Sequence, residues 1–347
     1  MMDMLSSAAW SLPLSIEIFV ASAIVIGVGG VLLTARAERL AIITGLGQLL
    51  TGAVIIGMVT SLSGLVTSVT AAYEGHASLA VSNSLGGIAA QTVFLAVADM
   101  VYRKANLEHA AASEANLLQC ALLIALLALP LLAMAHPDLA VFHVHPVSLL
   151  LVAGYLFGLH LIGQARERPM WMPRITPQTK PEETKKVAHP YRGLVTLWVT
   201  FSLLAVAVAV SGWLLARSAI AISQHAGLSE TLVGGILTAV TTSLPELVVA
   251  VAAVRRGALA LAVGDILGGN AFDVLFLSAS DVAYRKGSIY AAISSTEVFW
   301  IALSILLAGT LLVGMLRREK YGFWNIGFES FLVLVFYFLG ILMLMTG

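Results

Sequence analysis

Successive apolar stretches, each about as long as a membrane span, make up most of this chain and leave it few ways to fold. A transmembrane helix needs about 20 predominantly apolar residues. Only 11% of the residues are charged, whereas soluble domains carry about a quarter. The sequence therefore predicts an all-α, multi-pass integral membrane protein, with the lipid bilayer as its partner. On the length criterion we predict about ten transmembrane helices, at residues 14–34, 40–72, 78–102, 115–135, 146–164, 193–216, 230–254, 258–284, 290–316 and 324–345.

A polar, basic segment interrupts this series and divides the chain into two halves. It is rich in proline, lysine and arginine, a composition typical of a flexible surface linker. We predict a first five-helix repeat at 1–164, the linker at 165–192 and a second five-helix repeat at 193–347. Short basic loops stay on the cytoplasmic side of a membrane. We therefore expect a cytoplasmic linker, and a bacterial inner membrane as the location.

The two halves contain the same phrases, offset by 182 residues. Such self-similarity indicates an internal repeat. Each half holds an odd number of predicted spans, so the second copy should cross the membrane upside down relative to the first. Inverted repeats that meet near the midplane are a recurrent plan of secondary transporters. The matched phrases are Thr60-Ser61-Leu62 with Thr242-Ser243-Leu244, Leu85-Gly86-Gly87 with Leu267-Gly268-Gly269, and Tyr102-Arg103-Lys104 with Tyr284-Arg285-Lys286.

The second copy places a proline and an acid inside a span, in the stretch TTSLPELVVA. Pro245 removes a backbone donor, so we expect a kink or an unwound turn there. Thr242 and Glu246 share a helix face, with Ser243 beside them. Hydroxyl, carboxylate and freed carbonyl oxygens are the ligands that hard cations prefer. A carboxylate at membrane depth is costly, which favours a functional Glu246 over a protonated structural acid.

The following span, VGDILGGNAFDVLF, adds two more acids and an amide. Asp265 and Asp273 lie two turns apart on one face, with Asn270 one turn before Asp273. We interpret Asp273 as functional, and Asp265 less so because it lies nearer the start of the span. For Asn270, cation coordination and interhelical hydrogen bonding stay equally open. The glycines of this stretch favour close helix packing.

The first copy has neutral residues where the second has acids. Ser63-Gly64 stands for Pro245-Glu246, Asn83 for Asp265, Ile88 for Asn270 and Gln91 for Asp273. Thr60, Ser61 and Ser84 could still supply oxygens, as could Asn83 and Gln91.

Other polar residues have ordinary structural interpretations. We expect Asp99 and Asp281 to form interface salt bridges with Arg103 and Arg285. We expect Glu17, Glu297 and Glu329 to be hydrated near the ends of their spans. The histidines at 136, 143 and 145 could bind a transition metal, but a surface loop is the favoured interpretation, because the segment lacks a thiolate.

The stretches TTSLPEL and VGDILGGNAFDVLF resemble the second α-repeat of the cation/calcium exchanger superfamily, which includes the sodium/calcium exchangers. The layout of five helices plus five around a basic loop is also similar. The resemblance implies antiport, with cations bound between the repeats and exposed to each side in turn. It also implies that Thr242, Ser243, Glu246 and Asn270 coordinate the cation. The family has a second proline-glutamate pair and a second asparagine where this chain has Ser63-Gly64 and Ile88.

We therefore predict a secondary active cation antiporter with alternating access and altered selectivity, through a monovalent cation or proton coupling. The predicted cation site consists of Thr60, Ser61, Ser84, Thr242, Ser243, Glu246, Asn270 and Asp273. Calcium, sodium or protons are expected as substrates, with no resident cofactor and no nucleic acid as partner. The chain shows no nucleophile or phosphate-loop motif of an enzyme. The alternative is a non-transporting scaffold or regulatory protein derived from the same fold, which the neutral first repeat suggests.

Overall fold

A computed structural model describes most of the chain, and within the described residues the fold is helical, without strands. Eight helices in this part are long and apolar enough to cross a bilayer, and a bent pair would make a ninth. The predicted second span falls partly on 45–56, outside the described residues, as do Arg103 and most of the predicted linker. The described residues are 10–44, 57–102, 104–111, 113–170, 172–174, 176–177, 179, 193–322 and 326–346.

The long helices follow the predicted spans, and short helices connect them. Spanning segments are α1 (Leu12–Thr44), α4 (Ala77–Val101), α6 (Glu114–Ala135), α7 (Pro146–Glu167), α8 (Leu194–Ala226), α12 (Leu259–Asp273) continued by α13 (Leu275–Ala283), α15 (Ser295–Arg317) and α16 (Phe328–Thr346). The bent pair consists of α9 (Glu230–Leu232), the π-helix η4 (Val233–Thr238) and α10 (Ala239–Thr242), followed by α11 (Leu244–Arg255). Shorter helices are α3 (Leu62–Tyr73), α5 (Leu107–Ala110) and α14 (Ile289–Ala292).

The helix α1 is longer than the predicted span 14–34. It continues through Arg36 and Arg39 to Thr44. No glycine or proline occurs between 35 and 44, so nothing in the backbone ends the helix where the apolar stretch ends.

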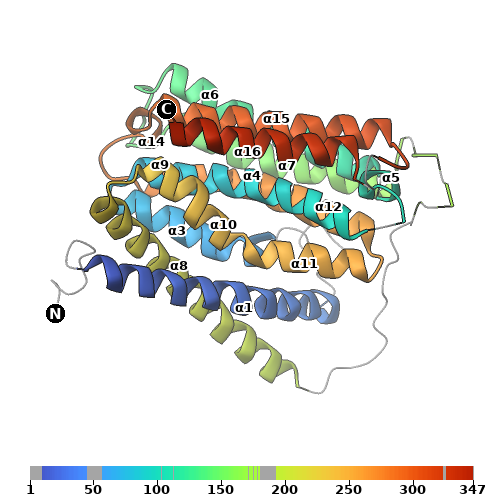
Figure 1. Ribbon diagram of the computed structural model, residues 1–347, viewed down its shortest axis with the longest axis horizontal. Coiled ribbons are helices and arrows are strands. Elements are labelled where there is room, and N and C mark those ends of the chain that lie inside the picture. Colours follow the sequence, from blue (N-terminus) through green and yellow to red (C-terminus); the bar gives the residue numbers. More distant parts are fainter. Residues whose placement is uncertain are drawn as a thin grey trace.

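The helices are arranged in layers around α4 (Figure 1). Buried residues make up 83% of the most apolar window of α4 and 72% of that of α12–α13, but only 17% in α8. The pair α1 and α8 lies on one side, and α6, α7, α15 and α16 lie on the other. Val28 and Leu203, on α1 and α8, are 60% and 65% exposed, as suits side chains that face lipid. Most polar residues of α4 and α12 are thus enclosed by protein, while Ser78 and Asp265 are half-buried.

The central helices α4 and α12–α13 run in opposite directions. The end of α4 at Val101 shares a groove with Arg256, which precedes α12. At the other end Lys286, which follows α13, lies against Gly75, which precedes α4. Because these helices occupy matching places in the two repeats, the repeats are inverted relative to each other.

Glycines let the bent helix approach α4 at backbone distance. A Cβ added to Gly86 would overlap the backbone of Gly235, and one added to Gly234 would lie 2.6 Å from the Leu79 carbonyl oxygen. Small residues permit this close approach in membrane helix pairs. The contact brings the break in the second repeat next to the middle of α4.

Candidate functional site

Each repeat breaks a helix at the same serine. Ser243 has φ −94° and ψ 3°, and the segments before and after it are bent by 43°. Ser61, its repeat partner, has φ −86° and ψ 6° and precedes α3. The predicted distortion near Pro245 is present, while in the first repeat the break lies two residues before Ser63-Gly64. A π-helix comes just before the second break, an irregularity that is frequent at functional sites.

The two breaks, α4 and α12 meet around a small buried cavity. The space in it that is open to the centre of a water-sized sphere is about 10 Å³, close to what one water needs. Both acids lie on this cavity. Glu246 is 7% exposed and Asp273 is 3% exposed. The cavity is lined by Ser61, Gly64, Asn83, Gly87, Gln91, Thr242, Ser243, Glu246, Asp273 and Phe276.

Side chains of the first repeat donate hydrogen bonds to oxygens of the second. Gln91 Nε2 donates to Asp273 Oδ2 at 2.6 Å and to Ser243 Oγ at 3.3 Å. Ser63 Oγ donates to the Thr242 carbonyl at 3.2 Å, a carbonyl next to the break. Neutral donors of the first repeat thus contact oxygens that could otherwise coordinate a cation.

A third and smaller break in the helical hydrogen-bond pattern, which the sequence analysis did not anticipate, follows Asp273. The predicted span 258–284 still forms one span, Leu259–Ala283, and Val274, between α12 and α13, keeps helical dihedrals of φ −59° and ψ −29°. Ser84 Oγ donates to the freed Asp273 carbonyl at 2.7 Å. No proline marks this break, so a single sequence offers little to find it. It places the Asp273 side chain at the end of a helix, facing the cavity.

Several buried oxygens around the cavity have no hydrogen-bond partner. These include one oxygen from each acid, Glu246 Oε2 and Asp273 Oδ1. The others are Ser61 Oγ, Asn83 Oδ1, Gln91 Oε1 and Asn270 Oδ1. Among the described residues no lysine, arginine or histidine lines the cavity. Buried polar groups normally have a partner, so a proton or a cation fits this set of atoms.

The structure brings together five of the eight predicted site residues, namely Ser61, Thr242, Ser243, Glu246 and Asp273. The other three lie outside the cavity lining. Thr60 Oγ1 donates to the Gly57 carbonyl, and Ser84 Oγ donates to the backbone carbonyl of Asp273. Asn270 Nδ2 donates to Thr92 Oγ1 at 3.1 Å. The Asn270 amide therefore makes the interhelical bond that the sequence left open, while its oxygen stays without a partner.

Five lining residues were not in the predicted set: Gly64, Asn83, Gly87, Gln91 and Phe276. The sequence analysis named Asn83 and Gln91, which stand where the second repeat has Asp265 and Asp273, only as further sources of oxygens. Phe276 is an apolar residue in an apolar span and carries no signal of a site. Its ring approaches the backbone at Gly64, where an added Cβ would lie 2.9 Å from Phe276 Cε2.

Two ordinary interpretations of the acids were wrong. Asp281 makes no salt bridge with Arg285 and instead accepts from the backbone of His145 and Ile289 and from Ser148 and Ser288. Helix ends offer free backbone N–H groups, which hold such an anion without a cation.

Of the three acids predicted to be hydrated at span ends, Glu17 is exposed, but the other two are buried. Glu297 and Glu329 are 0% exposed. Glu297 forms a capping box with Ser294 and accepts from Thr231 at 2.7 Å. A position near the end of a span does not determine whether a side chain is exposed, because α9 and α15 cover Glu297. Among the described residues no group of three or more acid, histidine or cysteine side chains could hold a metal ion, and this includes the histidines near 145.

Comparison with known proteins now places the chain. It is 27% identical over 277 residues to CaxA of Alkalimonas amylolytica, covering 79% of this chain and 82% of the relative. It is 30% identical over 140 residues to the sodium/calcium exchanger MaX1 of Methanosarcina acetivorans, covering 40% of each. The crystal structure of the H⁺/Ca²⁺ exchanger CAX superposes with a TM-score of 0.70 at 14% identity, covering 95% of this chain and 82% of that one.

The family model described as sodium/calcium exchanger protein matches residues 14–162 and 196–346. These two segments include both breaks and all the residues around the cavity. Members of this family are membrane cation antiporters of two-repeat architecture, which makes the chain a transporter rather than an enzyme. The chain thus belongs to the sodium/calcium exchanger protein family.

Proposed function

We propose that the chain exchanges a divalent cation of the calcium type for protons at the cavity between the two breaks. The observation that carries this proposal is the pair Glu246 and Asp273, two carboxyl groups on one cavity that no described basic residue lines. Two carboxylates balance the charge of one divalent cation. Calcium takes about 6–8 oxygens, and the carboxylates with Ser61, Gln91, Thr242 and Ser243 can supply that number.

The size of the cavity favours protons as the counter-substrate. The part of it that the centre of a water-sized sphere can reach is about 10 Å³, which is room for about one water. Two monovalent metal ions would need more space, whereas two protons on the carboxyl oxygens need none. Proton release before cation binding, and proton uptake after cation release, then keep the buried charge near zero, which avoids the high cost of an uncompensated anion.

The neutral first repeat supports a site that binds fewer cations than a site with a glutamate in each repeat would bind. Ser63 and Gln91 place hydroxyl and amide donors against Thr242 and Asp273. These donors substitute for cations in stabilising the oxygens. The neutral first repeat is therefore compatible with transport, and it does not require a scaffold protein that has lost it.

Alternating access follows in this proposal from the broken helices. The segments on either side of Ser243 meet at 43°, and hinges commonly lie at such element ends. Inverted repeats allow the same movement to open the cavity to opposite sides in turn. We expect the linker to be cytoplasmic and the protein to reside in a bacterial inner membrane.

The test is flux in proteoliposomes that carry a pH gradient. Uptake of ⁴⁵Ca²⁺ should be accompanied by proton release, read with a trapped pH dye, and should disappear in Glu246→Gln. Glu167→Gln, which changes an exposed acid at the end of α7, should behave as the wild type. Calcium flux that follows a sodium gradient and ignores pH would contradict proton coupling. Absence of flux for every cation pair would favour the scaffold.

A further inference from the structure

A second group of buried acids lies away from the exchange cavity, at the end of the bundle that the start of the linker contacts. Asp99 lies in the last turn of α4, Glu108 lies in α5 and Glu329 lies in the first turn of α16, and all three are 0% exposed. Neither the cavity lining nor the proposed exchange involves them.

Asp99 has a structural role that the repeat explains. It accepts from the backbone N–H of Leu107 at 2.7 Å and of Gly327 at 3.0 Å. Its partner in the other repeat, Asp281, accepts from Ile289 at 2.8 Å and from His145 at 2.7 Å. Asp99 thus joins the starts of α5 and α16, and Asp281 joins the starts of α14 and α7, which correspond to them in the repeat.

The two glutamates are not part of this repeated arrangement. At the offset of 182 residues, Glu108 corresponds to Tyr290 and Glu329 corresponds to Val147. Both of these are buried as well, at 2% and 7% exposure. At the other end the fold therefore forms this junction with its aspartate alone, and the two glutamates need their own explanation.

Three of the four carboxyl oxygens of the glutamates have no hydrogen-bond donor, and the two side chains lie within hydrogen-bonding reach of each other. Glu108 Oε2 and both oxygens of Glu329 are buried without a hydrogen bond, and Ser330 Oγ is 3.5 Å from Glu108 Oε1. A Cβ added to Gly314 or Gly327 would overlap the Glu329 side chain, so glycines provide the space that it occupies. An unpaired carboxylate buried in such a place is strongly destabilising.

Among the described residues, the charged groups that act on the pair are acids. Asp99 of α4 acts on both glutamates, and Glu319 of the loop after α15 acts on Glu329. Burial, Asp99 and Glu329 together raise the pKa of Glu108 well above its usual 4.5.

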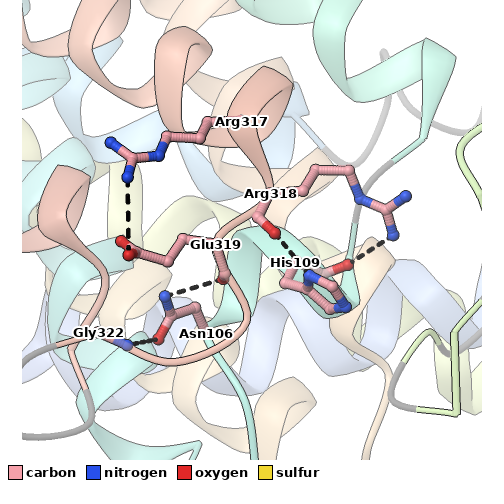
Figure 2. A network of polar contacts seen from close by, with 6 residues as sticks. All are labelled: Asn106, His109, Arg317, Arg318, Glu319 and Gly322. Atoms are coloured by element: carbon pink, nitrogen blue, oxygen red, sulfur yellow. Dashed lines mark hydrogen bonds and ion pairs between the residues drawn. The ribbon is translucent and has the colours of Figure 1, made fainter.

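The described cations nearby have other partners, as Figure 2 shows in part. Arg317 is 3.9 Å from Glu319 and lies over Phe328. Arg318 donates to the carbonyls of Arg174 and His109, and His109 contacts the Arg318 carbonyl. None of these groups neutralises the glutamates.

We infer that Glu108 and Glu329 hold a proton between them, as a carboxylic acid–carboxylate pair that forms a binding site separate from the exchange cavity. The proton adds no volume, supplies the missing donor and removes one negative charge beside Asp99. A divalent metal is the weaker choice, since no group of three described acids is placed to hold one. Packing of α5 against α16 then depends on this proton.

The proton makes folding stability depend on pH with a definite sign. In the unfolded chain both glutamates lose their protons above about pH 4.5, whereas the folded pair keeps one. Folding therefore binds a proton, and the stabilisation is complete below the unfolded pKa and is lost as pH rises through the folded pKa. Over that window the unfolding constant should rise about tenfold per pH unit.

One experiment measures unfolding by SDS in mixed micelles as a function of pH. Glu246→Gln/Asp273→Asn serves as the background, because it removes titration of the exchange cavity. Adding Glu108→Gln/Glu329→Gln should abolish most of the tenfold change per pH unit, and adding Glu167→Gln should leave it intact. An unchanged slope in the quadruple variant would overturn the inference.

Infrared spectroscopy tests the pair even if the quadruple variant does not fold. Protein labelled with ¹³C-glutamate should show a protonated glutamic acid C=O band at neutral pH in Glu246→Gln, which lacks the cavity glutamate. The band should disappear when Glu108→Gln and Glu329→Gln are added. In Glu246→Gln itself, the band should be replaced by a carboxylate band when the pH is raised. A Glu246→Gln protein with no such band would also overturn the inference.

Discussion

Gln91 Nε2 lies 2.6 Å from Asp273 Oδ2, so that an amide of the first repeat contacts an acid of the second at the position where their sequences correspond. The same nitrogen is 3.3 Å from Ser243 Oγ. One neutral side chain thus contacts both the helix break and the second acid of the cavity. Where the second repeat has the carboxylate of Asp273, the first repeat has the amide of Gln91, which donates a hydrogen bond to that carboxylate.

Replacing this donor should change the competition between protons and the cation. In Gln91→Leu, Asp273 loses a hydrogen bond worth about 1.5–3 kcal/mol to its charged form. A proton then binds this acid more tightly, so the pH for half-maximal calcium flux should rise by about one unit or more. Flux measured from pH 5 to 9 in proteoliposomes checks this. Gln164→Leu, on the exposed side of α7, should keep the wild-type profile.

The space beside Gly64 explains why the first copy cannot simply regain a glutamate. A Cβ there would lie 2.9 Å from Phe276 Cε2 and 3.6 Å from Thr242 Oγ1. Gly64→Glu should therefore lose flux and lower stability by about 1–3 kcal/mol, as overpacking does. Gly64→Glu/Phe276→Ala, which removes the ring, should recover much of the stability. A fully stable and active Gly64→Glu protein would contradict this packing argument.

The contact between Gly86 and the bent helix gives a prediction about stability. In Gly86→Ala the added methyl group meets the backbone of Gly235, which cannot rotate away as a side chain can. We expect a loss of about 1–3 kcal/mol and a lower melting temperature in detergent. Gly309→Ala, on α15, meets no atom within 4 Å. It should leave stability unchanged or raise it slightly, since alanine favours a helix over glycine by about 1 kcal/mol.

Sequence reasoning went furthest where a residue has one strong physical preference. Long apolar stretches could only be spans, Pro245 had to disturb its helix, and an acid such as Glu246 inside a span had to face protein. The repeat then gave the inverted arrangement, because an odd number of spans fixes the direction of the second copy. These features depend on local chemistry and on counting, both of which a single sequence contains.

What remained hidden depends on contacts between distant segments. The break at Val274 has no proline to mark it, and its freed carbonyl is satisfied by Ser84, far away in the chain. The sequence offered Asn83 and Gln91 as possible oxygen ligands, but their place on the cavity depends on the contact between α4 and α12. Glu297 and Glu329 are buried because other helices cover the ends of their own helices. Apolar length shows where a span ends, but it does not show what packs there.

Arg318 connects the loop after α15 to the start of the linker. It donates to the Arg174 carbonyl at 2.8 Å and to Thr179 Oγ1 at 3.3 Å. It also donates to the His109 carbonyl at 3.0 Å, while the His109 ring contacts Thr176 Oγ1 at 2.9 Å. The linker is therefore attached by one cation and one imidazole to the junction that holds Glu108.

Arg318→Ala should release this attachment. The variant removes three donated hydrogen bonds, each worth roughly 0.5–1.5 kcal/mol, so trypsin should cleave the lysine-rich linker several times faster. Arg317→Ala is the matched control, since Arg317 contacts Glu319 at 3.9 Å and the Phe328 ring and makes none of the linker bonds. Cleavage is read by gel over time in detergent, at one pH. Equal rates in the wild type and Arg318→Ala would show that the rest of the linker, and not this contact, limits its access to protease.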